Sequence, residues 1–337
     1  MAEYKGIHGT KVQNYTSDPA NPILGQVWYN ETSQTMKVQA VTTAGSWATG
    51  TSINTGRMTA PGTGSYTDMM IAGGISGPPL YNTFTNTELW NGSAWTETND
   101  INTARYGTGV AGTTTAALIY GGDLYPPYTN AVESWNGTSW TAGTSINTTR
   151  GLMSSAGQVY TDCMGFAGYT PGGTTGATEI WNGATWTEVN DLNTTPSRYH
   201  AGGTGADTTA ALCFGGGPTY QTSSETWNGT CWAATSAMNA VSGLLQTIGN
   251  SNTDCLGAGG GGPPTGFTAK TEQWNGTSWT EVADLPTLTR QQSYGNNGTT
   301  GSGLSVGGQQ PGISGPIDTV YDWLGAGSPT TRTITSS

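Results

Sequence analysis

The residues most able to do chemistry in this chain are few, and their spacing does not form a reactive site. The two histidines, His8 and His200, lie far apart and lack metal-ligand spacing. The four cysteines form no CxxC or Cys/His pattern, and Cys163 and Cys255 stand in two matching Thr-Asp-Cys segments. We therefore predict that these two thiols are small buried groups. We expect no catalytic residues, no metal ligands and no cofactor.

Arginine and glutamate instead recur at regular intervals. One repeat position holds arginine, and a second, two residues before a tryptophan, holds glutamate: Arg57, Arg105, Arg150, Arg198 and Arg290, and Glu88, Glu133, Glu179, Glu225 and Glu272. Such a set could form an ion-binding ring, but catalysis needs one asymmetric site rather than repeated copies. We predict that each Arg–Glu pair supports the fold. Removing one partner should cost about 3–5 kcal/mol, because it leaves a buried charge unpaired.

A Trp-Asn-Gly-x-x-Trp element repeats about every 46 residues. Its tryptophans are Trp90 and Trp95, Trp135 and Trp140, Trp181 and Trp186, Trp227 and Trp232, and Trp274 and Trp279. Asn and Gly tolerate positive φ, so the element predicts a tight β-hairpin. The tryptophans could be sugar-stacking platforms, but their presence in every hairpin favours packing between repeats. The triplets at Asn91, Asn136, Asn228 and Asn275 match glycosylation sequons, but turn chemistry explains them better.

The composition predicts that the repeated arginine, glutamate and tryptophan positions belong to a fold made of short strands. Only 9% of the residues are charged, while 53 are Gly and 13 are Trp, which leaves little material for helices and ample apolar surface to bury. Each period reads as four strands, and residues 116–122 show the apolar strand that ends in a glycine pair. We therefore expect an all-β fold with one four-stranded sheet per period.

The order Arg, Gly-Gly, Val-Glu-x-aromatic-Asn and then Trp resembles the kelch repeat, and no Trp-Asp or Gly-His dipeptide supports the WD type. The resemblance covers residues 47–323 and implies a six-bladed β-propeller. A strand starting near Ser46 should complete the last blade, formed by residues 290–323, and so close the ring. The pattern departs at Val241-Ser242, where arginine is expected, and at Gly165-Phe-Ala-Gly168, where a clean glycine pair is expected. In the last repeat Thr319-Val-Tyr321-Asp322 replaces Glu-x-Trp-Asn. Galactose oxidase, an enzyme on this propeller, holds copper with Tyr and His, and His200 alone cannot supply that set.

Residues 1–45 do not fit the repeat. Residues 25–39 alternate apolar and polar types around a polar turn, which predicts a β-hairpin, and residues 11–22 read as an extended anchoring arm. The segment Gly25-Gln-Val-Trp28-Tyr-Asn, followed by Gly45-Ser-Trp47, resembles the start of virion structural proteins of marine tailed phages. The resemblance implies that the arm docks onto a capsid or tail. Residues 325–337 are expected to form a tail that adds an outer strand or stays mobile.

The net charge of −11 and the pI near 4.4 disfavour nucleic acid as a partner. The sequence contains no apolar run long enough to span a bilayer, and its first residues lack the features of a secretory signal. We therefore expect synthesis in a cytoplasm, no membrane insertion and final localisation in a virion. An extracellular location is the alternative.

Binding should occur where the repeats differ, in the loops that follow the glycine pairs. The aromatic residues of these loops are the candidate ligand-binding set: Tyr81, Phe84, Tyr125, Tyr128, Tyr169, Tyr220 and Phe267. The leading hypothesis is a non-catalytic virion appendage, tail-fibre-like or a capsid decoration. Its propeller would bind a host-surface glycan or a neighbouring virion protein, and it could form a homo-oligomer. A secreted bacterial adhesin or lectin-like propeller is the alternative, and an enzyme acting on surface polysaccharide comes third.

Overall fold

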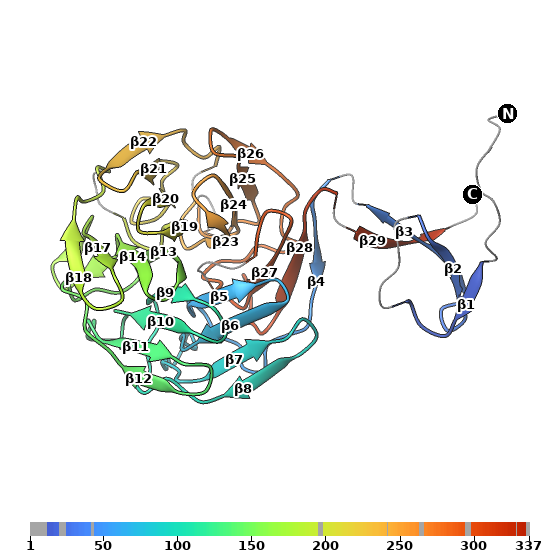
Figure 1. Cartoon of the computed structure of the whole chain (residues 1–337), viewed down its shortest axis with the longest axis horizontal. Coiled ribbons are helices and arrows are strands. Elements are labelled where there is room, and N and C mark those ends of the chain that lie inside the picture. Colours follow the sequence, from blue (N-terminus) through green and yellow to red (C-terminus); the bar gives the residue numbers. More distant parts are fainter. Residues whose placement is uncertain are drawn as a thin grey trace. The chain divides into compact units, whose positions relative to one another are not determined.

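A computed structural model describes residues 12–19, 25–41, 44–194, 198–240, 242–262, 266–293, 298–327 and 329–334 of the chain. The regular elements in these ranges are all β-strands, which confirms the all-β prediction. Within the same ranges, no helix is long and apolar enough to cross a membrane. The chain divides into two compact units, one formed by Ser46–Leu324 and the other by Met1–Gly45 with Gly325–Ser337 (Figure 1).

Five four-stranded antiparallel sheets follow one another along Ser46–Leu324, and a sixth sheet joins the two ends of this unit. The first sheet contains β5 (Gly62–Ser65), β6 (Asp68–Ala72), β7 (Thr87–Trp90) and β8 (Trp95–Thr98). The second contains β9 (Gly109–Gly112), β10 (Ala117–Tyr120), β11 (Val132–Trp135) and β12 (Trp140–Ala142). The third contains β13 (Ser154–Val159), β14 (Asp162–Phe166), β17 (Thr178–Trp181) and β18 (Trp186–Val189), with a hairpin of β15 (Tyr169–Thr170) and β16 (Gly173–Thr174) in its loop.

The remaining sheets repeat this arrangement. The fourth contains β19 (Gly202–Asp207), β20 (Ala210–Phe214), β21 (Ser224–Trp227) and β22 (Trp232–Thr235). The fifth contains β23 (Gln246–Ser251), β24 (Asp254–Ala258), β25 (Thr271–Trp274) and β26 (Trp279–Glu281). The sixth joins β27 (Ser302–Val306) and β28 (Val320–Leu324) to β4 (Ser46–Thr49). These repeated sheets are consistent with propeller blades.

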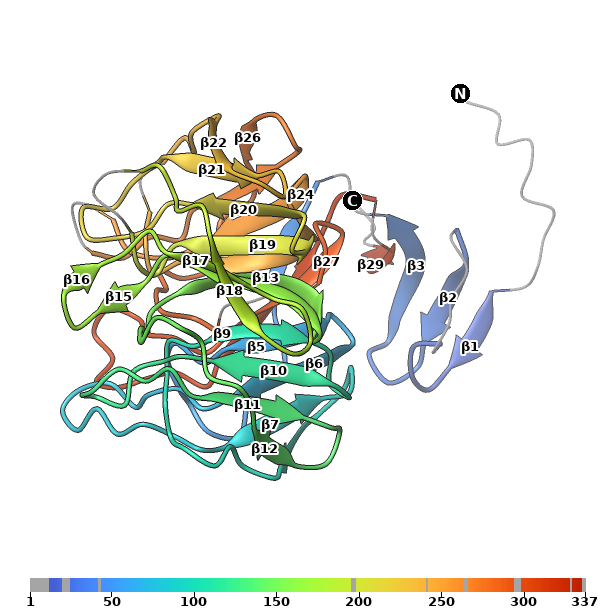
Figure 2. The same cartoon turned by 60° about the vertical axis from the view of Figure 1, so that its left-hand side comes forward.

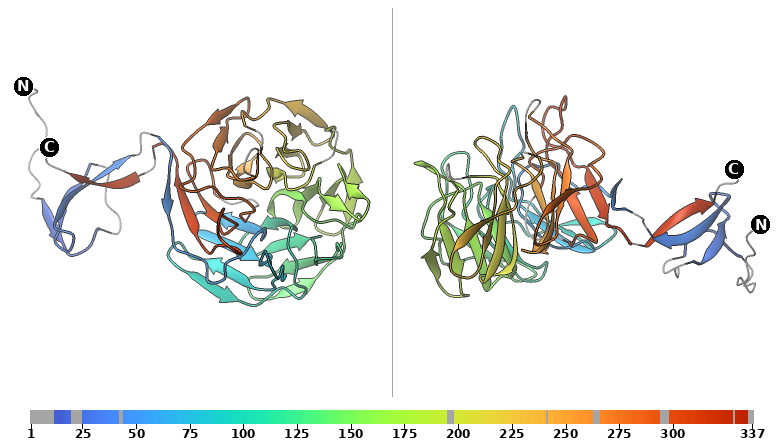
Figure 3. Two further views of the ribbon diagram at one scale, coloured as in Figure 1. Left: turned by 180° about the vertical axis from the view of Figure 1, so that it is seen from behind. Right: turned by 90° about the horizontal axis from the view of Figure 1, so that it is seen from above.

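The first strands of neighbouring sheets pack against one another (Figure 3). They can approach closely because they are built from small residues: all of β9 is buried, and a Cβ added to Gly203 of β19 would lie 2.8 Å from the Ser154 Cβ of β13. Apolar residues of the second strands fill the space between sheets, as Met164 and Phe166 do against Ala211 and Cys213. Burial of these apolar side chains is the main source of stability.

The sixth sheet confirms that the two ends of the repeat region pair. In its ladder Trp323 lies opposite Trp47, as Trp90 lies opposite Trp95 in the first sheet. This register corrects the expected alignment of the last repeat, because it puts Trp323 rather than Tyr321 at the first tryptophan position, and Tyr321 rather than Thr319 at the glutamate position. The fourth strand expected for this sheet involves residues 294–297, which lie outside the described ranges.

The glycine pairs lie just beyond the strands that precede them, and not at their ends as expected. Gly73 and Gly74 follow β6, and their backbone N–H groups donate to Asn86 O and to Arg105 O at 2.9 Å each. Both have positive φ, which glycine adopts without steric cost. In the third sheet Ala167 takes the first of these positions and keeps the left-handed conformation, with φ of 59°.

In each repeat, one backbone position lies in the connection that leads into the sheet and hydrogen-bonds to the same position of a neighbouring repeat. Its residues all have φ between 47° and 65°: Thr59, Gly107, Leu152, His200, Leu244 and Gln291. Their N–H groups donate to the corresponding carbonyl of the preceding repeat, as from Gly107 to Thr59 O at 3.1 Å. In the third repeat the donor is the N–H of Met153, the residue after Leu152, and it lies 3.4 Å from Gly107 O. Thr59 N in turn donates to Gln291 O at 2.8 Å, so a contact of the same kind joins the first and last repeats.

The second unit contains one four-stranded sheet, in the order β1 (Gln13–Tyr15), β2 (Val27–Asn30), β3 (Thr35–Val41) and β29 (Pro329–Ile334). β2 and β3 form the hairpin that the alternating pattern predicts, and β1, within the expected arm, pairs parallel to β2. β29 pairs antiparallel with β3, so the C-terminal tail adds a strand to this sheet. Residues 1–11 and 20–24 of the arm lie outside the described ranges.

Candidate functional site

The recurring arginines and glutamates form direct pairs in the first four sheets. Arg57 contacts Glu88, and the other guanidinium–carboxylate distances are 2.7 Å for Arg105–Glu133, 3.3 Å for Arg150–Glu179 and 2.7 Å for Arg198–Glu225. All eight side chains are at most 4% exposed. Each pair lies between a strand and the connection that leads into the same sheet, so it ties the two together.

Hydrogen bonds from the backbone complete each pair. Glu133 accepts the Asn102 N–H at 2.7 Å and the Thr103 N–H at 3.3 Å, while Arg105 donates to Ala131 O at 3.0 Å. Burial lowers the pKa of the Arg105 guanidinium, and the Glu133 charge partly offsets that effect. The arrangement pairs the buried charges and keeps them away from solvent, although the buried Nε atoms of Arg105, Arg150 and Arg198 have no hydrogen-bond partner among the described residues.

Arg290 does not belong to this set, contrary to the sequence prediction. The second glycine of each pair donates its N–H to the carbonyl of the arginine position, and Gly260 N donates to Thr289 O at 2.7 Å. Thr289 therefore holds that position in the sixth repeat, and Arg290 follows it. Its guanidinium instead contacts Gln309 Oε1 at 3.0 Å and lies 4.2 Å from the Phe267 ring centroid.

The paired tryptophans lie opposite each other in adjacent strands of one sheet, as Trp135 and Trp140 do with ring centroids 5.3 Å apart. Both are at most 6% exposed. The Trp140 indole N–H donates to Thr87 Oγ1 of the preceding sheet at 3.1 Å, and Trp232 and Trp279 make the same kind of contact. These rings are buried where sheets meet, so they offer no open platform for sugar.

The loops after the glycine pairs bring a second set of aromatic rings together on one face of the sheets. Tyr81 and Tyr125 stack with centroids 5.2 Å apart and planes 20° apart. Tyr128 lies 5.8 Å from Tyr169, which meets Tyr199 edge-on at 5.5 Å. We call Tyr81, Tyr125, Tyr128, Tyr169, Tyr199 and Tyr220 the tyrosine face; it draws on residues from the first to the fourth repeat.

A buried carboxylate positions part of this face. Asp123 is 7% exposed, and it accepts the Tyr106 hydroxyl at 2.8 Å and the Tyr125 N–H at 2.7 Å. Burial raises the pKa of Tyr106, and the hydrogen bond to Asp123 raises it further, so this phenol stays protonated at neutral pH. Tyr125, at φ of 58°, is thereby held with half of its surface exposed.

The structure separates the predicted aromatic set into two groups. Tyr81 and Tyr125 are 37% and 50% exposed, and Tyr128, Tyr169 and Tyr220 are half-buried. Phe84 and Phe267 are also half-buried, but each lies against a guanidinium, Phe84 at 5.9 Å from Arg57 and Phe267 beside Arg290. The two phenylalanines therefore support the loops from within. Pro263 and Pro264, in the loop before Phe267, lie outside the described ranges.

Two tyrosines of the site were missed by sequence reasoning. Tyr106 and Tyr199 follow the arginine position directly, and so lie outside the loops that follow the glycine pairs. Their isolated bridges to Asp123 and Gly217 bring them beside those loops. The Arg-Tyr dipeptide in two repeats was the available signal. Burial raises the pKa of Tyr199, and the neighbouring Tyr220 and Tyr169 add to the shift.

His200, Cys163 and Cys255 are buried, whereas Cys231 is exposed. His200 is 8% exposed, beside Tyr199, and burial lowers its pKa to about 3, so the imidazole is neutral at physiological pH. Cys163 and Cys255 are buried as predicted, and burial raises the pKa of both thiols. In the part of the chain that the structure describes, no three His, Cys, Asp or Glu side chains cluster in a way that could hold a metal ion.

Comparison with known proteins finds neither a matching family model nor a matching curated sequence.

Proposed function

We propose that Ser46–Leu324 is a closed six-bladed β-propeller of the kelch kind whose tyrosine face binds a glycan. Closure is supported by equivalent contacts at successive sheet boundaries. Ser154 Oγ of the third sheet donates to Ala201 O of the fourth repeat at 2.8 Å, and Ser293 Oγ of the last repeat donates to Ala60 O of the first at 2.9 Å. Gly308 N likewise donates to Arg57 O at 2.9 Å. Closure would leave no unpaired sheet edge at the junction.

The stacked Tyr81–Tyr125 pair is the observation that carries the binding proposal. Exposed aromatic rings held by backbone contacts provide flat apolar area with little loss of entropy on binding. Sugar rings present apolar C–H faces that such rings can cover, while the phenol hydroxyls can exchange hydrogen bonds with sugar hydroxyls. The net charge of −11 favours neutral over acidic sugars. A neighbouring virion protein would be the other partner suited to this surface.

Substitution of the face tests the proposal. Tyr125→Ala and Tyr128→Ala should each weaken binding to a neutral oligosaccharide about tenfold or more, as measured by calorimetry after a glycan-array screen. Tyr160→Ala is the matched control, because Tyr160 is also 37% exposed but lies in the β13–β14 turn, at the opposite end of β14 from Tyr169. Equal binding by all three variants would contradict the role of the face, and turnover of the oligosaccharide would contradict a purely binding role.

We further propose that the protein is a phage virion appendage, anchored to capsid or tail through the unit that contains residues 1–45. Support comes from the resemblance of residues 25–30 and 45–47 to virion proteins, and from a sheet of β1, β2, β3 and β29 that is compact in its own right. Deletion of residues 1–24 should leave assembled particles without the protein. Incorporation at normal levels would contradict the anchoring role and leave glycan binding unaffected.

A further inference from the structure

The fifth sheet lacks the cation that balances the buried glutamate in the first four sheets. Ser242 occupies the arginine position, because Gly216 N donates to Ser242 O at 2.8 Å just as Gly122 N donates to Arg150 O at 2.9 Å. The corresponding carboxylate, Glu272, is only 1% exposed. A hydroxyl therefore stands where the other sheets place a guanidinium.

The carboxylate of Glu272 keeps all of its other partners. It accepts the N–H and the side-chain amide of Asn239 and the N–H of Ala240, each at 2.8 Å. These bonds match those that Glu133 receives in the second sheet, so the site is folded as its equivalents are. Among the described residues, no Lys or Arg pairs with Glu272. Lys270 points its ammonium to Glu281 and Asp284 at the surface instead.

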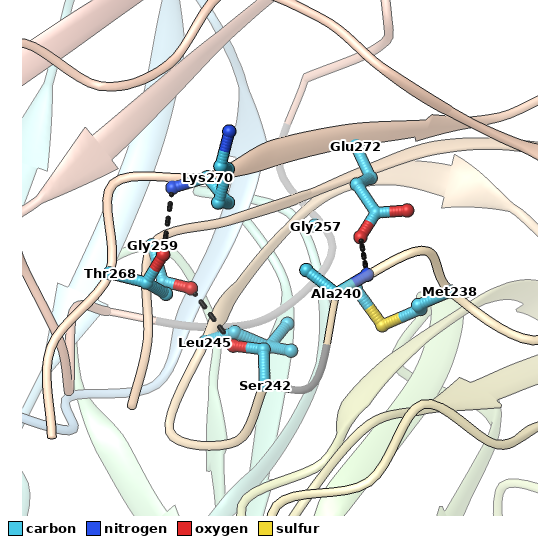
Figure 4. A pocket seen from close by; sticks show the side chains of 9 residues that line it. All are labelled: Met238, Ala240, Ser242, Leu245, Gly257, Gly259, Thr268, Lys270 and Glu272. Atoms are coloured by element: carbon cyan, nitrogen blue, oxygen red, sulfur yellow. Dashed lines mark hydrogen bonds between the residues drawn. The ribbon is translucent and has the colours of Figure 1, made fainter. Parts of the chain in front are cut away.

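A cavity of about 10 Å³ lies where the guanidinium would be (Figure 4). It is lined by Glu272, Ser242, Gly257 and Gly259, and also by Lys270, whose ammonium pairs with Glu281 and Asp284 at the surface. In the third sheet the equivalent carbonyls, Gly165 O and Ala167 O, accept bonds from Arg150 at 3.2 and 3.3 Å. In the fifth sheet the shorter side chain of Ser242 donates its hydroxyl to Gly259 O at 3.0 Å, and no other described side chain donates to this carbonyl. The space is close to the smallest that holds one water-sized occupant.

We propose that this cavity binds a small monovalent cation, such as potassium or ammonium, in place of the missing guanidinium. One carboxylate supplies a single negative charge, and the hydroxyl and backbone carbonyls around it are oxygen donors that suit a hard cation. A calcium ion is less suited to the site, because calcium sites usually combine several carboxylates and this cavity has one, Glu272. Occupation by a cation restores the charge balance that the first four sheets obtain from arginine.

Thermal unfolding in mixtures of potassium chloride and choline chloride at constant ionic strength tests the proposal. Choline is too large for the cavity, so raising potassium from 1 to 100 mM should raise the Tm of the wild-type protein by about 2–4 °C. Ser242→Arg supplies the cation covalently and should abolish the dependence on potassium, as should Glu272→Gln. Glu188→Gln, which removes an exposed carboxylate of β18 in the third sheet, should retain it.

Two results would overturn the proposal. One is a wild-type Tm that is equal in potassium and choline, which would mean that water fills the cavity. The other is a potassium effect that persists in Ser242→Arg, which would mean that the ion binds elsewhere. If Glu272→Gln fails to fold, crystals of the wild-type protein soaked in rubidium chloride provide the second measurement. Anomalous density beside the Glu272 carboxylate is the expected result, and its absence at that position would contradict the proposal.

Discussion

Four arginine side chains in this protein are almost completely buried, and each meets a buried glutamate. The free-energy cost of moving two charges out of water offsets much of the attraction between them, so such a pair is a weak source of net stability. Its importance lies in the backbone contacts it makes, because the guanidinium also donates to carbonyls such as Ala131 O. The pairs therefore fix the path of each connection against the sheet it enters.

Arg105→Met should lower the free energy of unfolding by about 3–5 kcal/mol, because it leaves Glu133 charged and buried without its partner. Urea denaturation measures the loss. The control is Lys270→Met, which removes an exposed pair with Glu281 and should leave the urea midpoint unchanged. A midpoint for Arg105→Met equal to that of the wild type would show that the pair has no structural role.

His200 should make the folded protein sensitive to mild acid. Its pKa is lowered to about 3 by burial, whereas the unfolded chain binds the proton near pH 6.5. The folded state therefore loses stability as pH falls below 6.5, by up to about 1.4 kcal/mol per pH unit. His200→Gln should lose this slope between pH 6.5 and 5, as measured by urea midpoints. Identical slopes in the two proteins would show that the imidazole titrates normally.

The pairs could be predicted from sequence because a fixed spacing repeats, but Arg290 shows the limit of that reasoning. Matching residue letters placed it with the other arginines. The backbone assigns positions by hydrogen bonds, however, and the last connection places Thr289 opposite Gly260. A one-residue shift changes which side chain points inward, and a single sequence does not reveal it.

At the scale of elements, strands with strong local patterns were predictable and those with distant partners were not. The Asn-Gly hairpins and the β2–β3 hairpin follow from turn chemistry and alternation. β29 is rich in threonine, has no apolar alternation and pairs with a strand far away in the sequence. The tyrosine face lies between these cases, because its loops were predicted but the contact of Tyr199 with Tyr169 depends on how two repeats pack.

Asp18 should stabilise the sheet of the smaller unit. Its carboxylate accepts bonds from Lys37 and Asn30 at 2.7 Å and from the Trp28 indole at 3.1 Å, and these contacts lower its pKa to about 2. A lowered pKa gives a contribution that is present above pH 4 and lost as pH falls through 2. Asp18→Asn should remove part of this contribution to stability. The loss should be smaller than the full pKa shift implies, because the Asp18 carboxylate is exposed.

The Trp28 indole N–H resonance reports on this sheet, because Trp28 is fully buried there. In Asp18→Asn this resonance should shift and broaden at neutral pH, while the tryptophan resonances of Ser46–Leu324 keep their positions. Lys37→Met, which removes the strongest influence on the carboxylate, is the companion variant. An unchanged Trp28 resonance in both variants would show that Asp18 does not hold the sheet.

At the scale of the whole Ser46–Leu324 unit, closure of the ring depends on how the last sheet meets the first. β4 completes the sheet of β27 and β28, which brings the ends of a long repeat region together (Figure 2). Such pairing of distant segments cannot be read from any local pattern. It was predicted from the phase of the repeat, since Trp47 opens a fourth strand and the region ends after a third-strand segment near Asp322.

Disulfide formation across the proposed closure tests this claim most directly. At the proposed closure the Ser293 Oγ donates to Ala60 O at 2.9 Å, and at the boundary of the third and fourth repeats the Ser154 Oγ donates to Ala201 O at 2.8 Å. Oxidised Ala60→Cys/Ser293→Cys protein should contain the intramolecular disulfide, seen by mass spectrometry, as readily as Ser154→Cys/Ala201→Cys does. Formation of the second disulfide but not the first would contradict a closed ring of six sheets.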